Sequence, residues 1–319
     1  MKILVFGFYD KNNLGDELFK SAFNKLFPLY EFTFINHISL PVLKDIDIVF
    51  LGGGSFLETK LNASDEAFEV LKTKKIFYIG IGSETLIHDS HKELIKLAKL
   101  VAIRTKVNIS NILELNKNVI VIPDLVYYLD ASLSNFKIKK SVCIIPNISV
   151  VPKWNQPHWK HASWEYFKIE FSQFLDELIN DGYLINFFQM CDNYDLNDNY
   201  AATEIISRMT KVPNNKILLD RYKDILSATE VISKYDVIIS QRYHGSVLAH
   251  MSQTQCLTIF HHDKLKDVYG EKISYYSLCK DVLRKKINEI LLNKHKIMPI
   301  DCDMFITLKQ KVENAICGH

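Results

Sequence analysis

An arginine and a histidine stand two residues apart, at Arg242 and His244, directly after an apolar run at residues 236–240 that predicts a buried strand. A helix is predicted to start at Gly245. A guanidinium binds phosphate or carboxylate through paired hydrogen bonds, and the N-terminus of a helix offers free N–H groups to the same anions. A histidine beside a bound phosphate is favoured in its protonated form and can act as a general acid. The segment therefore predicts an anion site with a proton donor.

Glycine is scarce in this chain and is placed at the ends of predicted strands. Only 11 of the 319 residues are glycine, and seven of these lie in the first 82 residues. The triplet Gly52, Gly53, Gly54 follows one buried strand, and Gly80 and Gly82 lie at the end of the next. The pattern G-x-x-x-x-G-K-[ST] and the pattern G-x-G-x-x-G are both absent from the sequence. These glycines predict a shared site at one sheet edge, but not P-loop or NAD chemistry.

A third glycine site follows the first predicted strand, where Asn13, Gly15 and Asp16 open a helix. Asp16 and Glu17 have a structural interpretation as first-turn acids that satisfy the helix dipole. The alternative is that Asp16 is a ligand or base for an acceptor hydroxyl.

Three further charged residues follow predicted strands. The guanidinium of Arg104 beside the glycine segments suits a phosphate or carboxylate, and Lys264 is interpreted as a further anion contact. Asp124 after Pro123 is typical of a turn. His261 and His262 are adjacent and have no partner at ligand spacing, so we predict no metal site.

Two polar segments receive structural interpretations. His158 and His161, flanked by Trp154, Trp159 and Trp164, are either a sugar-stacking loop or an aromatic cover, and we favour the cover. Residues 192–199 are rich in Asp and Asn but lack the glycine and the final glutamate of a calcium loop, so we expect a solvated loop.

Short apolar strands alternate with amphipathic helices along the whole chain, which predicts an α/β fold with two Rossmann-like domains facing a cleft. A polar, basic stretch at residues 127–140 is interpreted as the linker, giving domains 1–137 and 138–319, with the last helix packing back on the first domain. The predicted strands are 2–8, 31–35, 47–51, 75–81, 100–104, 118–122, 141–146, 183–188, 216–219, 236–240 and 255–260, and the predicted helices are 14–26, 64–71, 92–100, 166–180, 201–209, 223–234, 245–253 and 304–316.

Composition excludes several classes of protein. The net charge of +2, from 39 basic and 37 acidic residues, predicts no face for nonspecific nucleic-acid binding. The N-terminal apolar run at residues 3–8 is too short for a signal-peptide core, and no stretch approaches the length of a membrane span. The six cysteines form no C-x-x-C pair, as is typical of reduced thiols. We therefore expect a cytoplasmic protein.

Taken together, the motifs resemble the polysaccharide pyruvyl transferase family. The resemblance extends over about residues 2–264, and Arg242-x-His244 is its most specific part. At Thr105 the chain departs from the family, in which an acidic residue usually follows the arginine. The other residues that support the resemblance are Asn13, Gly15, Asp16, Glu17, Gly52, Gly53, Gly54, Arg104 and Asp124.

The resemblance implies a GT-B-like fold and the transfer of a pyruvyl group from phosphoenolpyruvate to two hydroxyls of a sugar. The reaction would form a cyclic ketal and release phosphate without a metal or cofactor. His244 would protonate the enol carbon, and Arg242, with Arg104 and Lys264, would bind phosphoenolpyruvate. Asp16 would deprotonate the acceptor and Asn13 would orient it. The remaining substrate-binding positions implied are Gly15, Gly53, Gly54 and Gly245.

The expected partners are phosphoenolpyruvate and a sugar or glycolipid acceptor, with no nucleic acid and no membrane span; peripheral association with a lipid-linked acceptor stays open. One alternative function is a GT-B glycosyltransferase that uses a nucleotide sugar, because the architecture and an Arg-x-His anion site serve a diphosphate equally well. Another is a catalytically inactive glycan-binding homologue, which the departure at Thr105 favours.

Overall fold

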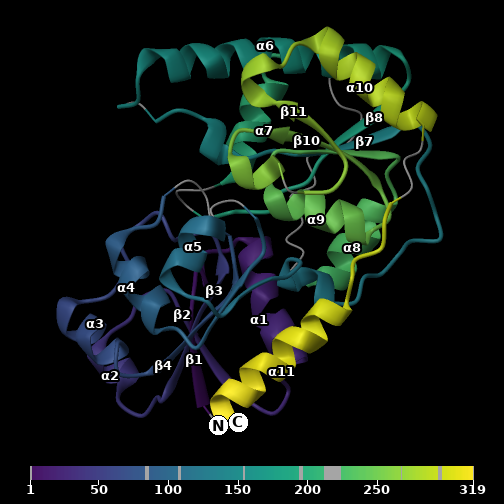
Figure 1. The fold of residues 1–319 in the computed structure, drawn as a ribbon. Coiled ribbons are helices and arrows are strands. Elements are labelled where there is room, and N and C mark those ends of the chain that lie inside the picture. Colours follow the sequence, from purple (N-terminus) through teal and green to yellow (C-terminus); the bar gives the residue numbers. More distant parts are fainter. Residues whose placement is uncertain are drawn as a thin grey trace. The chain divides into compact units, whose positions relative to one another are not determined.

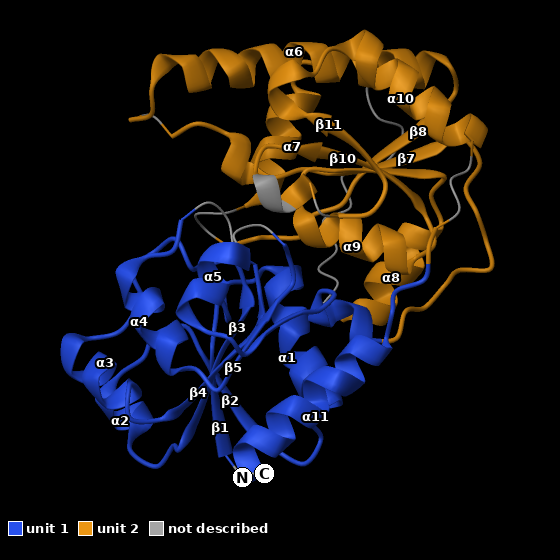
Figure 2. Ribbon diagram, in the orientation of Figure 1, with its two compact units in different colours: residues 1–129, 299–319 blue, residues 130–298 orange. Residues whose placement is uncertain are grey.

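Two compact units make up the chain (Figure 2). Unit 1 is Met1–Leu129 with Pro299–His319, and unit 2 is Asp130–Met298. The division falls inside the predicted linker at residues 127–140, before the predicted boundary at residue 137. The structure is a computed structural model, and it describes residues 2–82, 86–106, 109–153, 155–193, 197–211, 224–266, 268–293 and 297–318, without the side chains of residues 263 and 264.

Unit 1 is built on a parallel sheet with the strand order β2-β1-β3-β4-β5-β6 within the described residues. Each strand of the centre is apolar on both faces, as strands buried between two layers of helices are. Val5 of β1, for example, lies opposite Phe34 of β2 and Phe50 of β3. The strands are β1 Lys2–Phe6, β2 Glu31–Ile35, β3 Ile48–Gly54, β4 Lys75–Ile81, β5 Leu100–Ile103 and β6 Val119–Val121.

Helices cover both faces of this sheet (Figure 1). On one face, buried residues of α3, α4 and α5 pack against Val49, Tyr78 and Val101. On the other face, the rings of Phe23 of α1 and of Phe27, its C-cap residue, lie 6.0 and 5.8 Å from the ring of Phe50. The helical elements of the first segment are α1 Leu14–Leu26, α2 Leu40–Leu43, α3 Asp65–Leu71, α4 Asp89–Leu97, α5 Ile109–Leu115 and the 3₁₀ turn η1 Leu125–Tyr128.

The last helix, α11 (Asp303–Cys317), belongs to unit 1, where it contacts β5. Its buried residues, Phe305, Leu308, Val312 and Ile316, recur every three or four positions and so form one apolar stripe. The Phe305 ring lies 5.3 Å from that of Tyr128. Apolar burial on one stripe is what stabilises this helix against the sheet.

Unit 2 repeats the strand arrangement of unit 1. Its parallel sheet has the order β11-β10-β9-β7-β8 within the described residues, so in both units the first strand lies between the second and the third. Figure 1 shows α6 and α10 on one face of the sheet and α8 and α9 on the other. The elements are β7 Ser141–Ile145, η2 Ile148–Val150, α6 His158–Asn180, β8 Leu184–Phe187, α7 Asp198–Ile206, α8 Ile225–Ser233, β9 Val237–Ser240, α9 Tyr243–Met251, β10 Gln255–Phe260, η3 Asp263–Lys266, β11 Glu271–Ser274, η4 Tyr275–Ser277 and α10 Lys280–Asn293.

Three details differ from the sequence-based expectation, and one prediction stays untested. The three glycines after the third predicted strand are the last residues of β3, where Gly52 pairs with Ile79. Helix α6 begins at His158, so residues 158–164 are helical and Trp164 lies in the core, stacked on Phe167, while Trp154 lies outside the described residues. Strand β11 and helix α10 were not predicted. The strand predicted at residues 216–219 lies outside the described residues.

Within the part of the chain that the structure describes, no helix is long and apolar enough to cross a bilayer.

Candidate functional site

The strand order places a preferred ligand position in each sheet. In open α/β sheets, ligands bind outside the carboxyl ends of the strands where the strand order reverses. In unit 1 this point lies between β1 and β3, and in unit 2 between β7 and β9. The segments that follow these four strands contain most of the predicted site residues.

In unit 1, Asn13 and Asp16 form a pair at the start of α1. The Asn13 Nδ2 donates to Asp16 Oδ2 over 2.5 Å, and the Asn13 side chain makes no capping hydrogen bond. Asp16 is buried, and so is Gly15 in the same turn. Glu17 accepts from the backbone N–H of Asp10 and pairs with Lys20. The two acids therefore have different surroundings: Asp16 accepts from Asn13, and Glu17 pairs with Lys20.

Gly53 and Gly54 end β3 opposite this pair. Both have left-handed backbone conformations, with φ of +70° and +120°, which glycine adopts without steric cost. A Cβ on Gly54 would lie 3.5 Å from Asp16 Oδ1, and a Cβ on Gly53 would lie 2.7 Å from the Phe19 ring. The glycines thus bring the backbone close to the Phe19 ring and to the Asp16 carboxylate.

Arg104 follows β5 and is only 8% exposed. Its Nη1 donates to Asp124 Oδ2 over 2.5 Å, its Nη2 donates to Ser55 Oγ over 3.1 Å, and its guanidinium lies 5.7 Å from the centre of the Phe19 ring. Asp124 also accepts from the Val126 N–H at the start of η1, so it is a turn residue, as predicted, as well as the partner of Arg104. The buried pair neutralises the guanidinium charge and fixes Ser55, directly after the glycines.

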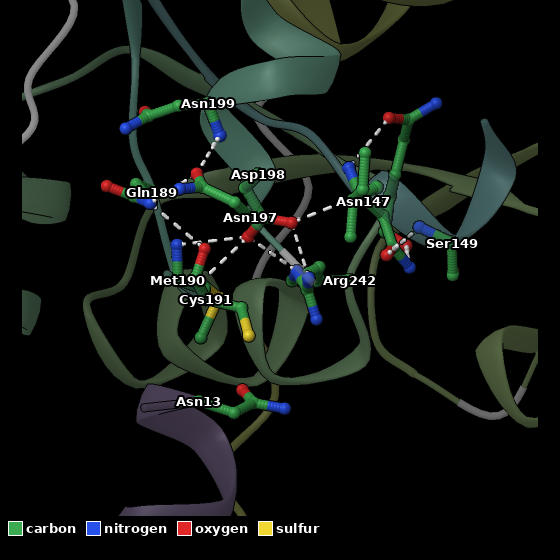
Figure 3. Close-up of polar contacts among 12 residues, drawn as sticks. Asn13, Asn147, Ser149, Gln189, Met190, Cys191, Asn197, Asp198, Asn199 and Arg242 are labelled. Carbon is green, nitrogen blue, oxygen red and sulfur yellow. Dashed lines mark hydrogen bonds and ion pairs between the residues drawn. The ribbon is translucent and has the colours of Figure 1, made fainter. Parts of the chain in front are cut away.

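In unit 2, Arg242 is held by Asp198 (Figure 3). The Arg242 Nε donates to Asp198 Oδ2 over 2.7 Å, and its Nη2 donates to Oδ1. This bidentate pair fixes the plane of the guanidinium. Asp198 is the first residue of α7 and has no exposed surface.

Three backbone N–H groups donate hydrogen bonds to the Asp198 carboxylate. The N–H groups of Met190 and Cys191 donate to Oδ2 over 3.2 and 2.9 Å, and the Ile148 N–H donates to Oδ1 over 3.2 Å. Burial raises the pKa of the Asp198 carboxyl, and Arg242 with these N–H groups acts in the opposite direction. The expectation of a solvated loop at residues 192–199 is therefore wrong at Asp198, because this side chain turns inward to pair with Arg242.

His244 lies in the first turn of α9 and is buried, with 8% of its surface exposed. Arg242 is the N-cap residue of this helix, and its backbone is fixed by the Ser240 hydroxyl, which accepts from the Arg242 N–H and donates to the Arg242 carbonyl. A Cβ on Gly245 would lie 2.3 Å from Ser240 Oγ and 3.0 Å from Ile145 Cδ1. Because Gly245 has no side chain, the first turn of α9 can lie in close contact with the ends of β7 and β9.

Lys264 lies in η3, and its side chain falls outside the described residues. Among the residues that are described, no three His, Cys, Asp or Glu side chains lie together as a metal ion would need.

Fold and site together define an α/β protein with two parallel-sheet units, each with polar groups at the point where its strand order reverses. The sequence profile of the polysaccharide pyruvyl transferase family matches residues 13–263, which is most of the chain. The chain therefore belongs to the polysaccharide pyruvyl transferase family, as its motifs predicted. No curated protein is significantly similar to it in sequence.

Solved structures agree on the fold. UDP-GlcNAc 2-epimerase from Neisseria meningitidis, bound to UDP-GlcNAc, is 11% identical and has a TM-score of 0.60, with 100% of each chain covered. MnaA of S. aureus, solved with UDP, is 11% identical and has a TM-score of 0.61, with 99% of this chain and 96% of that chain covered. The predicted GT-B-like α/β fold is confirmed.

Two residues that position the predicted side chains, Asp198 and Ser55, were not predicted from the sequence. Asp198 and Ser55 contact Arg242 and Arg104 through hydrogen bonds between residues 44 and 49 positions apart. In the sequence, Asp198 lies just before the helix predicted at residues 201–209. An aspartate at that place is explained equally well as a helix cap.

Proposed function

We propose that this protein transfers a pyruvyl group from phosphoenolpyruvate to two hydroxyls of a sugar in a polysaccharide, glycan or glycolipid precursor. The observation on which the proposal rests is the guanidinium of Arg242, two residues before the buried His244 and fixed by Asp198, at the N-terminus of α9, where the strand order of unit 2 reverses. A permanent cation, the N-terminus of a helix and an imidazole together suit a substrate with a phosphate, a carboxylate and a carbon to be protonated.

Phosphoenolpyruvate would bind to the guanidinium of Arg242. Asp198 pairs with the edge formed by Nε and Nη2, which fixes the plane that the guanidinium presents to an anion. The N-terminus of α9 would favour the phosphate through the helix dipole. Lys264, which follows β10 in sequence, is assigned as a further anion contact.

The chemistry would begin with proton transfer. The imidazolium of His244 gives a proton to C3 of phosphoenolpyruvate, and the double-bond electrons form the new C–H bond, which leaves C2 electron-poor. One sugar hydroxyl then attacks C2 and loses its proton to a base. Breaking of the C2–O bond releases phosphate, and the second hydroxyl attacks C2 to close the ketal, its proton returning to the imidazole. The two hydroxyl protons balance the C–H formed and the proton on the released phosphate.

The acceptor role is assigned to unit 1 from its own geometry. Asp16 would act as the base and Asn13, which donates to it, would orient the carboxylate. Gly54, which has no side chain, would let a sugar hydroxyl approach Asp16. The buried Arg104 would support this site through Ser55 rather than by contact with the substrate.

Phosphate release tests the proposal. With phosphoenolpyruvate and a panel of glycosides, His244→Ala is expected to lower the rate of phosphate release by at least about 100-fold, the lower end of what a general acid contributes. His37→Ala replaces an exposed histidine of unit 1 and should leave the rate unchanged. Turnover of His244→Ala near that of the wild type would refute the role of His244.

A nucleotide-sugar transferase is the second candidate, because the two structures above, which share the fold, were solved with UDP or UDP-GlcNAc. Under that alternative the same cation and helix N-terminus would bind a diphosphate.

A further inference from the structure

An open hollow lies at the carboxyl edge of the unit 2 sheet. It holds about 460 Å³ of empty space, part of it open to solvent. The lining comes from the segments after β7, β10 and β11 and from the first turns of α6. The lining residues are Ser149, Val150, Gln156, Trp159, Lys160, Ser163, His261, His262, Tyr275 and Tyr276.

The hollow adjoins the Arg242 site through the short turn η2. The Ile148 N–H donates to the Asp198 carboxylate that holds Arg242, while the next two residues, Ser149 and Val150, line the hollow. The Ser149 hydroxyl lies 3.4 Å from His261 Nε2 on the opposite wall. A ligand in the hollow would therefore lie next to the proposed phosphoenolpyruvate site within the same unit.

Two aromatic rings of the lining are exposed. Trp159 is 55% exposed and Tyr276 is 62% exposed, although large aromatic side chains normally bury much of their surface. A pyranose ring has an apolar C–H face that stacks on such rings and a rim of hydroxyls that hydrogen-bonds to polar side chains. Ser149, Gln156 and Ser163 supply those polar groups.

Tyr275 adds an unused hydrogen-bonding group. Its side chain is 6% exposed and lines the hollow, and its hydroxyl is buried with no hydrogen-bond partner among the described residues. Burying such a group without a partner lowers stability. A hydroxylated ligand could supply the missing partner.

The charge of the lining selects the kind of ligand. Lys160 and two histidines line the hollow, and no aspartate or glutamate is among the lining residues. The Lys160 Nζ lies 5.6 Å from the centre of the Trp159 ring, so the cation stands beside the stacking surface. A ligand that stacks there would meet a positive charge at its edge.

We propose that this hollow binds a sugar unit bearing a carboxylate, as part of the saccharide to be modified. Only the last clause rests on the proposed function. The sugar ring would stack on Trp159 or Tyr276, its hydroxyls would bind Ser149, Gln156 and Tyr275, and its carboxylate would pair with Lys160.

Direct binding in the absence of phosphoenolpyruvate tests the proposal. The probes are methyl β-D-glucuronide, the uncharged methyl β-D-glucoside and uridine monophosphate. The binding of each probe is measured by saturation-transfer NMR, with competition between the probes. The wild type should bind the glucuronide at least about fivefold more tightly than the glucoside. Trp159→Ala and Tyr276→Ala should each weaken glucuronide binding by at least about fivefold, and Lys160→Gln should abolish the preference for the glucuronide.

Matched controls lie close by. Tyr166→Ala removes a half-exposed aromatic from the same helix and Lys285→Gln removes an exposed lysine of unit 2, and neither residue lines the hollow. Both should bind the glucuronide as the wild type does. Glucuronide binding that is absent, or that survives Trp159→Ala and Tyr276→Ala, would overturn the proposal. Tighter binding of the uridine probe at this place would assign the hollow to a nucleotide instead. Phosphate release from phosphoenolpyruvate is measured separately, so either proposal can fail without the other.

Discussion

The orientation of the Arg242 side chain depends on Asp198, which lies 44 positions away in the sequence. The guanidinium can favour one position of an anion only if its plane is fixed, and the carboxylate of Asp198 fixes it. The carboxylate is held in turn by three backbone N–H groups. We infer that Asp198 is a positioning residue for the anion site.

Asp198→Asn is expected to weaken binding of phosphoenolpyruvate at least about tenfold, measured by calorimetry, because the guanidinium loses its fixed orientation. Removing one partner of a buried pair also costs about 3–5 kcal/mol of stability. Asp176→Asn is the matched control, since Asp176 is a buried carboxylate of unit 2 that accepts from the backbone N–H groups of Thr210 and Lys211. Tighter binding in Asp198→Asn would contradict the positioning role and show that Asp198 restrains the charge of Arg242.

Arg242 and His244 were predictable from the sequence because they lie two residues apart in the chain and follow an apolar run. Asp198 was not predictable, because its ion pair with Arg242 depends on how the segment after β8 folds back toward β9. The same holds for Arg104, whose type suggested an anion ligand. Its burial beside Asp124 depends on the packing of two strand ends, which local pattern does not specify.

At the scale of elements, apolar periodicity predicted most strands and helices because buried parallel strands are apolar on both faces. The ends of elements were less predictable. Gly52 continues β3 because its missing side chain lets β4 approach: a Cβ would lie 2.0 Å from the Ile79 carbonyl oxygen. Helix α6 starts early because Trp164 packs into the core, a tertiary contact.

The end of β3 gives a prediction at this scale. Gly54→Ala should lower stability by about 1–3 kcal/mol, the cost of a strained backbone conformation, and should raise the KM for the acceptor, because the new methyl group narrows the space beside Asp16. Gly182→Ala is the control: its φ is +84° and a Cβ there meets nothing within 4 Å. Both variants should lose similar stability in urea unfolding. Equal acceptor KM values in the two would contradict the site assigned to the end of β3.

At the scale of the whole molecule, the two units share a strand order with no shared motif, and the alternation of strands and helices was enough to predict two α/β units. The local sequence pattern says little about which distant segments pack into the same unit. In unit 1, helix α11 comes from the other end of the chain, and its Phe305 packs beside Tyr128.

Phe305→Ala is expected to destabilise unit 1 by about 3–5 kcal/mol, because it removes a fully buried aromatic side chain. Unfolding in guanidinium, monitored by circular dichroism, should show one transition with its midpoint at a lower denaturant concentration. The neighbouring Ile306 is 54% exposed, so Ile306→Ala should change stability by less than about 0.5 kcal/mol. Equal effects of the two substitutions would show that the apolar stripe of α11 does not stabilise the unit.

The central claim is that the anion site of unit 2 takes phosphoenolpyruvate. Calorimetric titration tests it without knowledge of the acceptor, by comparing phosphoenolpyruvate with UDP on the wild type and on Arg242→Gln. We predict that the wild type binds phosphoenolpyruvate, that UDP binds at least about tenfold more weakly, and that Arg242→Gln loses phosphoenolpyruvate binding. Binding of UDP in preference to phosphoenolpyruvate, abolished by Arg242→Gln, would contradict the account and assign the site to a nucleotide sugar.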